Sequence, residues 1–162
     1  MRFMIICSLW MMSATIASAE VTVMIELSEV SVQQTKPSGK QWDFGLGKMS
    51  RPDLLVTIYL DGTPILKSKK YRDTFSAQFS ERSLPLTLSG KRTLTVRLVD
   101  SDLRHDDLID QLSVEVSEDD ALMGRSFRLT GRSTLNVTLK MTPLSVALPT
   151  SSPSNNKAAR LP

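Results

Sequence analysis

Five carboxylates are crowded into one short stretch of this chain. The segment VDSDLRHDDLIDQL, residues 99–112, holds the aspartates Asp100, Asp102, Asp106, Asp107 and Asp110. Like charges held close together repel one another, so folding must work against that repulsion. The stretch is therefore either a solvated acidic turn or a place where a positive ion sits.

A second acidic segment lies earlier in the chain. QQTKPSGKQWDFGLGKMSRP, residues 33–52, contains Asp43 and is followed at once by Asp53. A loop this long is uncommon in a compact domain and is often functional. Loops at the same end of a β-sandwich lie close in space, so we expect the two acidic segments to meet.

The elements that must position these loops are strands. VTVMIEL (21–27), TLTVRLV (93–99) and TLNVTLKM (134–141) alternate apolar and polar residues, which is typical of strands with one buried face. Further strand-like segments are 54–60, 65–68, 74–79, 84–88, 112–116 and 126–130. Turn signals such as Asp61-Gly62 and Ser89-Gly90 separate them. We predict an all-β fold, an antiparallel eight-stranded β-sandwich.

The two ends differ from the middle in composition. Residues 1–19 have an arginine, a short apolar run and Ala17-Ser18-Ala19, the pattern of a cleaved signal peptide. The apolar run is shorter than a membrane span requires. Residues 144–162 are rich in Ser, Pro and Asn, which predicts a disordered tail. We therefore expect a secreted or periplasmic protein with one domain at residues 20–143.

Composition disfavours several functions. Cys7 is the only cysteine and lies in the predicted signal peptide, so we expect neither disulfides nor thiol chemistry in the domain. A formal charge of +3 is too small to indicate nucleic-acid binding. The chain has no Gly-x-Ser-x-Gly motif, and its one histidine, His105, cannot form a zinc site with cysteines. We predict that the protein is not an enzyme.

The acidic stretch resembles a family motif. VDSDLRHDDLID resembles the third loop of C2 domains, a strand ending in D-x-D followed by D-[LF]-I, and Asp100, Asp102 and Asp107 take the three acidic places. The choice between Asp106 and Asp107 for the third place stays open. Asp110 stands where the family usually has Gly, and the loop is one residue shorter than usual.

Earlier segments extend the resemblance to roughly residues 21–141. RPDLLV is similar to the family's S-D-P-Y-V, with Asp53 in the acidic place, and WDFGLGKMSRPD supplies Asp43, although more residues than usual separate the two. YRDTFSAQFSE keeps Thr74, Phe79 and Glu81 of another family stretch but lacks its Pro.

This resemblance implies a Ca²⁺ site between the first and third loops. Its ligands would be Asp43, Asp53, Asp100, Asp102 and Asp107. The two side chains of D-x-D point the same way on an extended backbone. Ca²⁺ takes six to eight oxygen ligands, and sites of this kind outside the cell have dissociation constants of about 10⁻⁴–10⁻³ M. The competing interpretation is a pair of solvated acidic loops.

The resemblance also implies peripheral docking to anionic phospholipid membranes. Trp42, Phe44 and Leu46 would contact the membrane, or Trp42 and Phe44 would fold back over the sandwich end. Lys67, Lys69 and Lys70 would bind polyanions, or would protect an edge strand. The alternative function is a Ca²⁺-rigidified or metal-free module of the cell envelope that binds a protein or polysaccharide.

Overall fold

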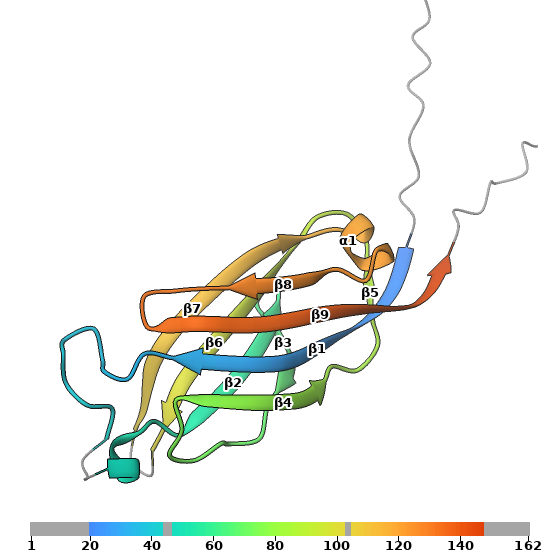
Figure 1. Cartoon of the computed structure of the whole chain (residues 1–162). Helices are drawn as coiled ribbons and strands as arrows, with labels where there is room; N and C mark the ends of the chain where they lie inside the picture. Colours follow the sequence, from blue (N-terminus) through green and yellow to red (C-terminus); the bar gives the residue numbers. More distant parts are fainter. Residues whose placement is uncertain (1–19, 44–46, 103–104, 148–162) are drawn as a thin grey trace, which may run out of the picture.

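The computed structural model describes residues 20–43, 47–102 and 105–147. The predicted signal peptide and residues 148–162 lie outside this range. Within it the chain forms nine strands, a short 3₁₀ helix and one α-helix (Figure 1). In chain order these are β1 (Glu20–Val32), η1 (Gly47–Ser50), β2 (Leu54–Leu60), β3 (Thr63–Lys67), β4 (Ser76–Arg82), β5 (Leu86–Leu88), β6 (Arg92–Ser101), β7 (Asp106–Val116), α1 (Glu118–Leu122), β8 (Ser126–Leu129) and β9 (Thr134–Ala147).

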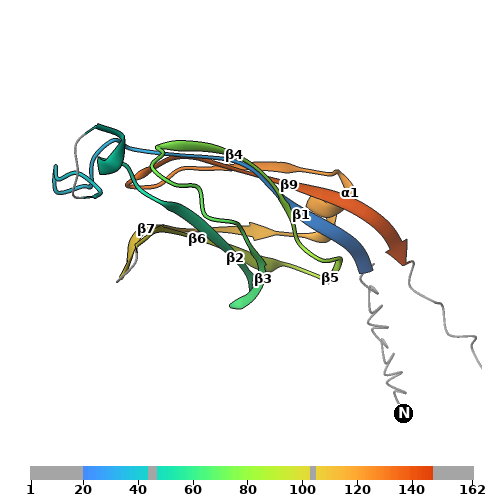
Figure 2. The ribbon, with the colours of Figure 1, turned by 90° about the horizontal axis from the view of Figure 1, so that it is seen from below.

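The strands form two antiparallel sheets that pack face to face (Figures 1 and 2). One sheet has the order β4-β1-β9-β8, and the other has the order β3-β2-β6-β7. β5 pairs with the start of β1, at Val21–Val23, whereas β4 pairs further along it, at Glu26–Ser31. β4 and β5 therefore share one position beside β1. The predicted eight-stranded sandwich is confirmed, with one of its eight positions filled by two short strands.

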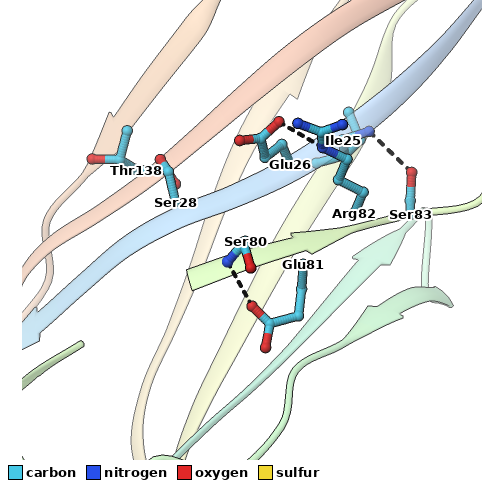
Figure 3. A network of polar contacts seen from close by, with 8 residues as sticks. All are labelled: Ile25, Glu26, Ser28, Ser80, Glu81, Arg82, Ser83 and Thr138. Carbon is cyan, nitrogen blue, oxygen red and sulfur yellow. Dashed lines mark hydrogen bonds and ion pairs between the residues drawn. The ribbon is translucent and has the colours of Figure 1, made fainter. Parts of the chain in front are cut away.

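Pro85 explains why β4 and β5 are separate strands, and Ser83 holds the chain beside β1 between them. Proline has no N–H to donate to a strand ladder. Just before it, the Ile25 N–H donates to Ser83 Oγ (3.0 Å) and the Ser83 N–H donates to the Ile25 carbonyl (2.8 Å), which keeps the chain against β1 (Figure 3). The Arg82 guanidinium pairs with Glu26 at 2.9 Å on the outer face.

The core lies between the sheets and follows the predicted alternation. Val21, Val23, Ile25 and Leu27 on β1 are fully buried, and so are the inward residues of β2 and β6. A fully buried Val, Leu or Ile side chain contributes about 1.5–3 kcal/mol. The hydrophobic contacts between the two sheets therefore hold the fold without a disulfide in the described residues.

One strand boundary and one helix in this part of the chain differ from the prediction. β7 begins at Asp106 instead of residue 112, because Ser101 and Asp100 of β6 pair with Asp106 and Asp107. Register with β6 thus overrides the low strand propensity of aspartate. The structure also contains a helix that the sequence patterns do not predict, α1, which begins at a capping box formed by Ser117 and Asp120.

The acidic loops meet at one end of the sandwich. The segment between β1 and β2, which includes η1, lies at the same end of the sandwich as the end of β6 and the start of β7, and the start of β1 and the end of β9 lie at the opposite end (Figures 1 and 2). The Ser101 N–H donates to the Asp53 carbonyl at 2.9 Å, which joins the two segments directly. In the described ranges, no helix has the length and apolar character needed to cross a membrane.

β9 runs four residues past the predicted domain boundary at residue 143. Glu20, Val21 and Thr22 pair with Ala147, Val146 and Ser145. The sequence did not predict this pairing. The residues after Pro143 show no apolar period, yet Ser145 pairs with β1.

We expect a chain truncated after Pro143 to be less stable than one truncated after Ala147, by about 2 kcal/mol, because a few backbone hydrogen bonds of about 0.5–1.5 kcal/mol each are lost. Urea unfolding of the two truncated chains measures this difference. Equal midpoints would show that the last residues of β9 add nothing to the fold.

Candidate functional site

Asp100 is the centre of the acidic end. It follows Leu94, Val96 and Leu98 on the inward face of β6, and it is 0 % exposed. One carboxylate oxygen, Oδ1, accepts a hydrogen bond from the Asp53 N–H at 2.7 Å. The other, Oδ2, is buried without a hydrogen-bond partner. A buried acceptor with no partner is energetically costly, and no described residue supplies a partner for this oxygen.

Two further carboxylates converge on Asp100. One oxygen from each of Asp43, Asp100 and Asp102 can be chosen so that all three lie within 4.8 Å of one another. Asp102 is exposed and Asp43 is half-buried. Asp102 follows Asp100 on the same side of the chain, and Asp43 enters from the loop after β1. We call these three residues the acidic triad.

Burial and the repulsion of neighbouring carboxylates disfavour the charged forms of Asp100 and Asp43. Burial raises the pKa of Asp100 to about 7, and the charges of Asp43 and Asp102 act in the same direction. Burial also raises the pKa of Asp43 to about 6, helped by the charge and hydrogen bond of Asp102. A cation placed among the three carboxylates would remove this repulsion.

The other two predicted ligands are already paired. Asp53 Oδ1 accepts from the Asp73 N–H at 2.9 Å, and its Oδ2 lies 3.1 Å from the Lys70 ammonium. Asp107 pairs with the Lys36 ammonium at 2.6 Å. The structure therefore brings Asp43, Asp100 and Asp102 together, whereas Asp53 and Asp107 lie in ion pairs with lysines.

Asp110, which stands where C2 domains usually have glycine, has a structural role. Its Oδ2 accepts from the backbone N–H groups of Ser133 and Thr134, both at 2.7 Å. A Cβ at Gly131 would lie 2.6 Å from Leu112 Cδ2 and 2.7 Å from the same Oδ2, so a larger residue there would displace both side chains. Asp110 thus fixes the turn between β8 and β9 against β7.

The membrane-contact prediction for Trp42 is wrong. Trp42 is 5 % exposed and belongs to the hydrophobic core. Its Nε1–H donates to the Gln33 carbonyl at 2.9 Å, which satisfies the only polar group of the ring. Trp42 therefore covers the end of the sandwich, the alternative that the sequence left open. Phe44 and Leu46 lie outside the described residues.

In the structure, Lys70 points away from the other two lysines of the predicted polyanion patch. Lys67 and Lys69 are exposed, and the Lys69 ammonium lies 5.0 Å from the centre of the Tyr71 ring. Lys70 instead faces the acidic end and donates to the Ser101 carbonyl at 2.6 Å. The chain leaves the β3 ladder after Lys67, so strand alternation no longer decides where Lys70 points.

Sequence reasoning missed the role of both lysines at this end. Lys36 belongs to the long loop, lies 2.6 Å from Asp107 and places its ammonium 5.7 Å from the Trp42 ring centre. No local pattern marks it, because 71 residues separate Lys36 from Asp107. Lys70 lies in the run KSKKYR, whose other basic residues suggest a basic surface patch and give no sign of its role.

Three carboxylates with an unpartnered buried oxygen form a set of hard oxygen donors. Such donors suit Ca²⁺ or Mg²⁺ better than softer transition metals. The described residues hold no histidine or cysteine in this cluster. The arrangement can therefore bind a divalent cation, and it leaves coordination positions for water or an external oxygen.

Without a divalent cation, we expect stability to fall as pH rises from 5 to 7. The folded state keeps a proton on Asp100, with its pKa near 7, that the unfolded chain releases near its usual value of 3.8. Folding therefore binds a proton between these values, and raising the pH opposes it. Asp43 acts in the same direction.

Thermal melts in EDTA at pH 5, 6, 7 and 8 measure this trend. Asp100→Asn should flatten most of it, because the amide does not titrate. A wild-type midpoint that rises between pH 5 and 7 would contradict the buried, repelled carboxylates.

Comparison with known proteins identifies the fold. No protein-family model and no curated protein matches the sequence. A C2 domain protein from Ramazzottius varieornatus is similar in structure, with a TM-score of 0.58 and 12 % identity over 79 % of this chain and 91 % of that chain. A structure of two C2 domains of Extended-Synaptotagmin 2 gives a TM-score of 0.55 and 12 % identity over 90 % of this chain and 48 % of that chain.

Human GIVD cytosolic phospholipase A2, solved with an inhibitor and terbium chloride, gives a TM-score of 0.55 and 19 % identity. The match covers 78 % of this chain but only 18 % of the phospholipase chain. Together with the two antiparallel sheets, these similarities establish that the chain has the fold of a C2 domain.

Proposed function

We propose that this domain binds Ca²⁺ in the acidic triad and uses the bound ion to dock to anionic phospholipid. The observation that carries the proposal is the buried Oδ2 of Asp100, which has no hydrogen-bond partner among the described residues, on a carboxylate that groups with those of Asp43 and Asp102. No described residue donates a hydrogen bond to this oxygen. A metal ion satisfies it and also neutralises its two neighbours.

The irregular set of oxygen donors in the triad favours Ca²⁺ over Mg²⁺. Ca²⁺ accepts irregular sets of six to eight oxygens, whereas Mg²⁺ demands near-ideal octahedral geometry. The triad joins a core strand to two loop residues, Asp43 and Asp102, which is a loosely constrained donor set. Its three carboxylates would supply only part of the Ca²⁺ shell, and a lipid phosphate oxygen is chemically suited to the rest.

Lipid docking requires an apolar contact near the ion, and Leu108 is the described residue that offers one. It follows Asp107 in β7 and is 55 % exposed. It also borders an open groove of about 520 Å³ that is lined by Lys36 and Arg132. An exposed leucine beside two cations matches the interface of an anionic membrane, where apolar and phosphate groups meet.

The proposal includes export, because residues 1–19 have the sequence of a signal peptide. Extracellular Ca²⁺ modules bind with dissociation constants of about 10⁻⁴–10⁻³ M. A site with three carboxylates is consistent with that weak range.

We expect 10 mM Ca²⁺ to raise the melting midpoint by about 4 °C, because an ion present at tenfold its dissociation constant stabilises the folded state by about 1.4 kcal/mol. Asp100→Asn should abolish this rise, since it removes the central ligand. The measurement is a thermal melt in EDTA, Ca²⁺ or Mg²⁺.

Asp106→Asn is the matched control, because Asp106 lies in the same hairpin, is exposed and is not in the triad. It should respond to Ca²⁺ as the wild type does. Terbium emission excited through Trp42, which is adjacent to Asp43, gives an independent readout. A full Ca²⁺ response in Asp100→Asn would exclude the triad as the site.

We expect Leu108→Ser to weaken Ca²⁺-dependent binding to phosphatidylserine vesicles at least threefold while leaving the Ca²⁺-induced melting shift unchanged. The reason is that it removes apolar contact but no ligand. Co-sedimentation with vesicles measures binding. Leu84→Ser is the control, because Leu84 is 83 % exposed and lies after β4, away from the acidic loops.

Vesicle binding that ignores Ca²⁺, or is absent in Ca²⁺ although the melting shift is present, would reject lipid docking. The second result would leave Ca²⁺ as a stabiliser of a module with another partner.

A further inference from the structure

A polar groove next to the acidic loops takes no part in the proposed function. It has a volume of about 650 Å³, which is the size of a site for a small organic ligand. Three segments form it: the loop after β1, the end of η1 with the residue that follows, and the segment that leads into β4. We call it the Arg51 groove, and its lining includes Gln34, Thr35, Gln41, Arg51, Phe75 and Ser76.

Backbone hydrogen bonds hold the walls of the Arg51 groove together. The Val32 N–H at the end of β1 donates to the Phe75 carbonyl at 2.8 Å. The Thr74 N–H donates to the carbonyl of Pro52, the residue after Arg51, at 3.0 Å. The segment before β4 is thus tied to both other walls. The groove exists without a ligand, so binding there would require little ordering of the chain.

Arg51 is the cation of this groove. It is half-buried, and its guanidinium lies 5.3 Å from the centre of the Phe75 ring. Among the described residues, no carboxylate lines the groove and none forms an ion pair with Arg51. A guanidinium is a planar fork of N–H donors that pairs best with a carboxylate or a phosphate. Arg51 is therefore suited to hold an anion from outside the chain.

The other polar side chains of the groove are neutral. Gln34, Thr35, Gln41 and Ser76 are exposed, and their side chains form no hydrogen bond with another described residue. Amides and hydroxyls both donate and accept hydrogen bonds. The hydroxyls of a saccharide do the same, so the two sets of groups are complementary. A lining with so many polar side chains is poorly suited to an acyl chain.

We propose that the Arg51 groove binds an acidic saccharide. A carboxylate of the saccharide pairs with the Arg51 guanidinium, and its hydroxyls exchange hydrogen bonds with Gln34, Thr35 and Gln41. The groove holds its ligand through a cation of the chain, so it needs no Ca²⁺. This second ligand is independent of the proposed function, because the acidic triad contributes no residue to the groove.

The test is the binding of oligogalacturonate, a short chain of uronic acids, to the full chain in EDTA, measured by isothermal titration calorimetry. A maltooligosaccharide of equal length is the neutral counterpart and should bind at least tenfold more weakly. Arg51→Gln should weaken oligogalacturonate binding roughly tenfold, because the charge-assisted pair with the carboxylate is lost. Thermal melts check that the variant is folded.

Arg97→Gln is the matched control. Arg97 is exposed on β6, in the other sheet, and it does not line the Arg51 groove. The variant loses the same charge and should bind oligogalacturonate as the wild type does. A loss equal to that of Arg51→Gln would show attraction by net charge alone and would overturn the inference.

If Arg51→Gln does not fold, NMR spectra of the wild type decide. Oligogalacturonate should shift the backbone amide signals of residues 34–35, 50–51 and 74–76, and shifts confined to other residues would overturn the inference. Absent binding, equal binding of the neutral saccharide, or unchanged binding in the folded Arg51→Gln would also overturn it. Tighter binding of glycerophosphoserine would assign the groove to a lipid headgroup instead. The Ca²⁺-induced melting shift tests the proposed function separately.

Discussion

A buried carboxylate at the end of a hydrophobic strand face governs this end of the molecule. Asp100 continues the inward row of Leu94, Val96 and Leu98, so the geometry that buries the core also buries its carboxyl group. Taking a carboxylate out of water is costly unless it is paired or hydrogen-bonded. The Asp53 N–H donates a hydrogen bond to one carboxylate oxygen, whereas the other oxygen has no partner among the described residues.

The aspartates around Asp100 consequently fall into two classes. Asp43 and Asp102 converge with it and form a region of negative charge, whereas Asp53 and Asp107 are neutralised by lysines of the chain itself. This division separates residues suited to hold an ion from residues that hold the surrounding loops. The Lys70–Asp53 pair, with side chains 30 % and 18 % exposed, is screened less by solvent than a pair on an open surface.

Two residues near the acidic loops, Asp110 and Trp42, have structural roles in the fold. Asp110, in place of glycine, accepts two backbone N–H groups of the β8–β9 turn. Trp42, which its loop position suggested for a membrane contact, fills the end of the core. Both roles depend on segments distant in sequence, so residue type alone could not distinguish them from exposed loop residues.

Features that depend on near neighbours in the chain could be read from the amino-acid order alone. Alternation set the inward face of β1 and β6, Asp61-Gly62 formed the turn between β2 and β3 with positive φ at both residues, and D-x-D put Asp100 and Asp102 on one side. Which charges pair was decided by the folded chain. Strand register and loop closure bring Lys36 to Asp107 across 71 residues, and no local period encodes such a contact, because it depends on how the two sheets place their loops.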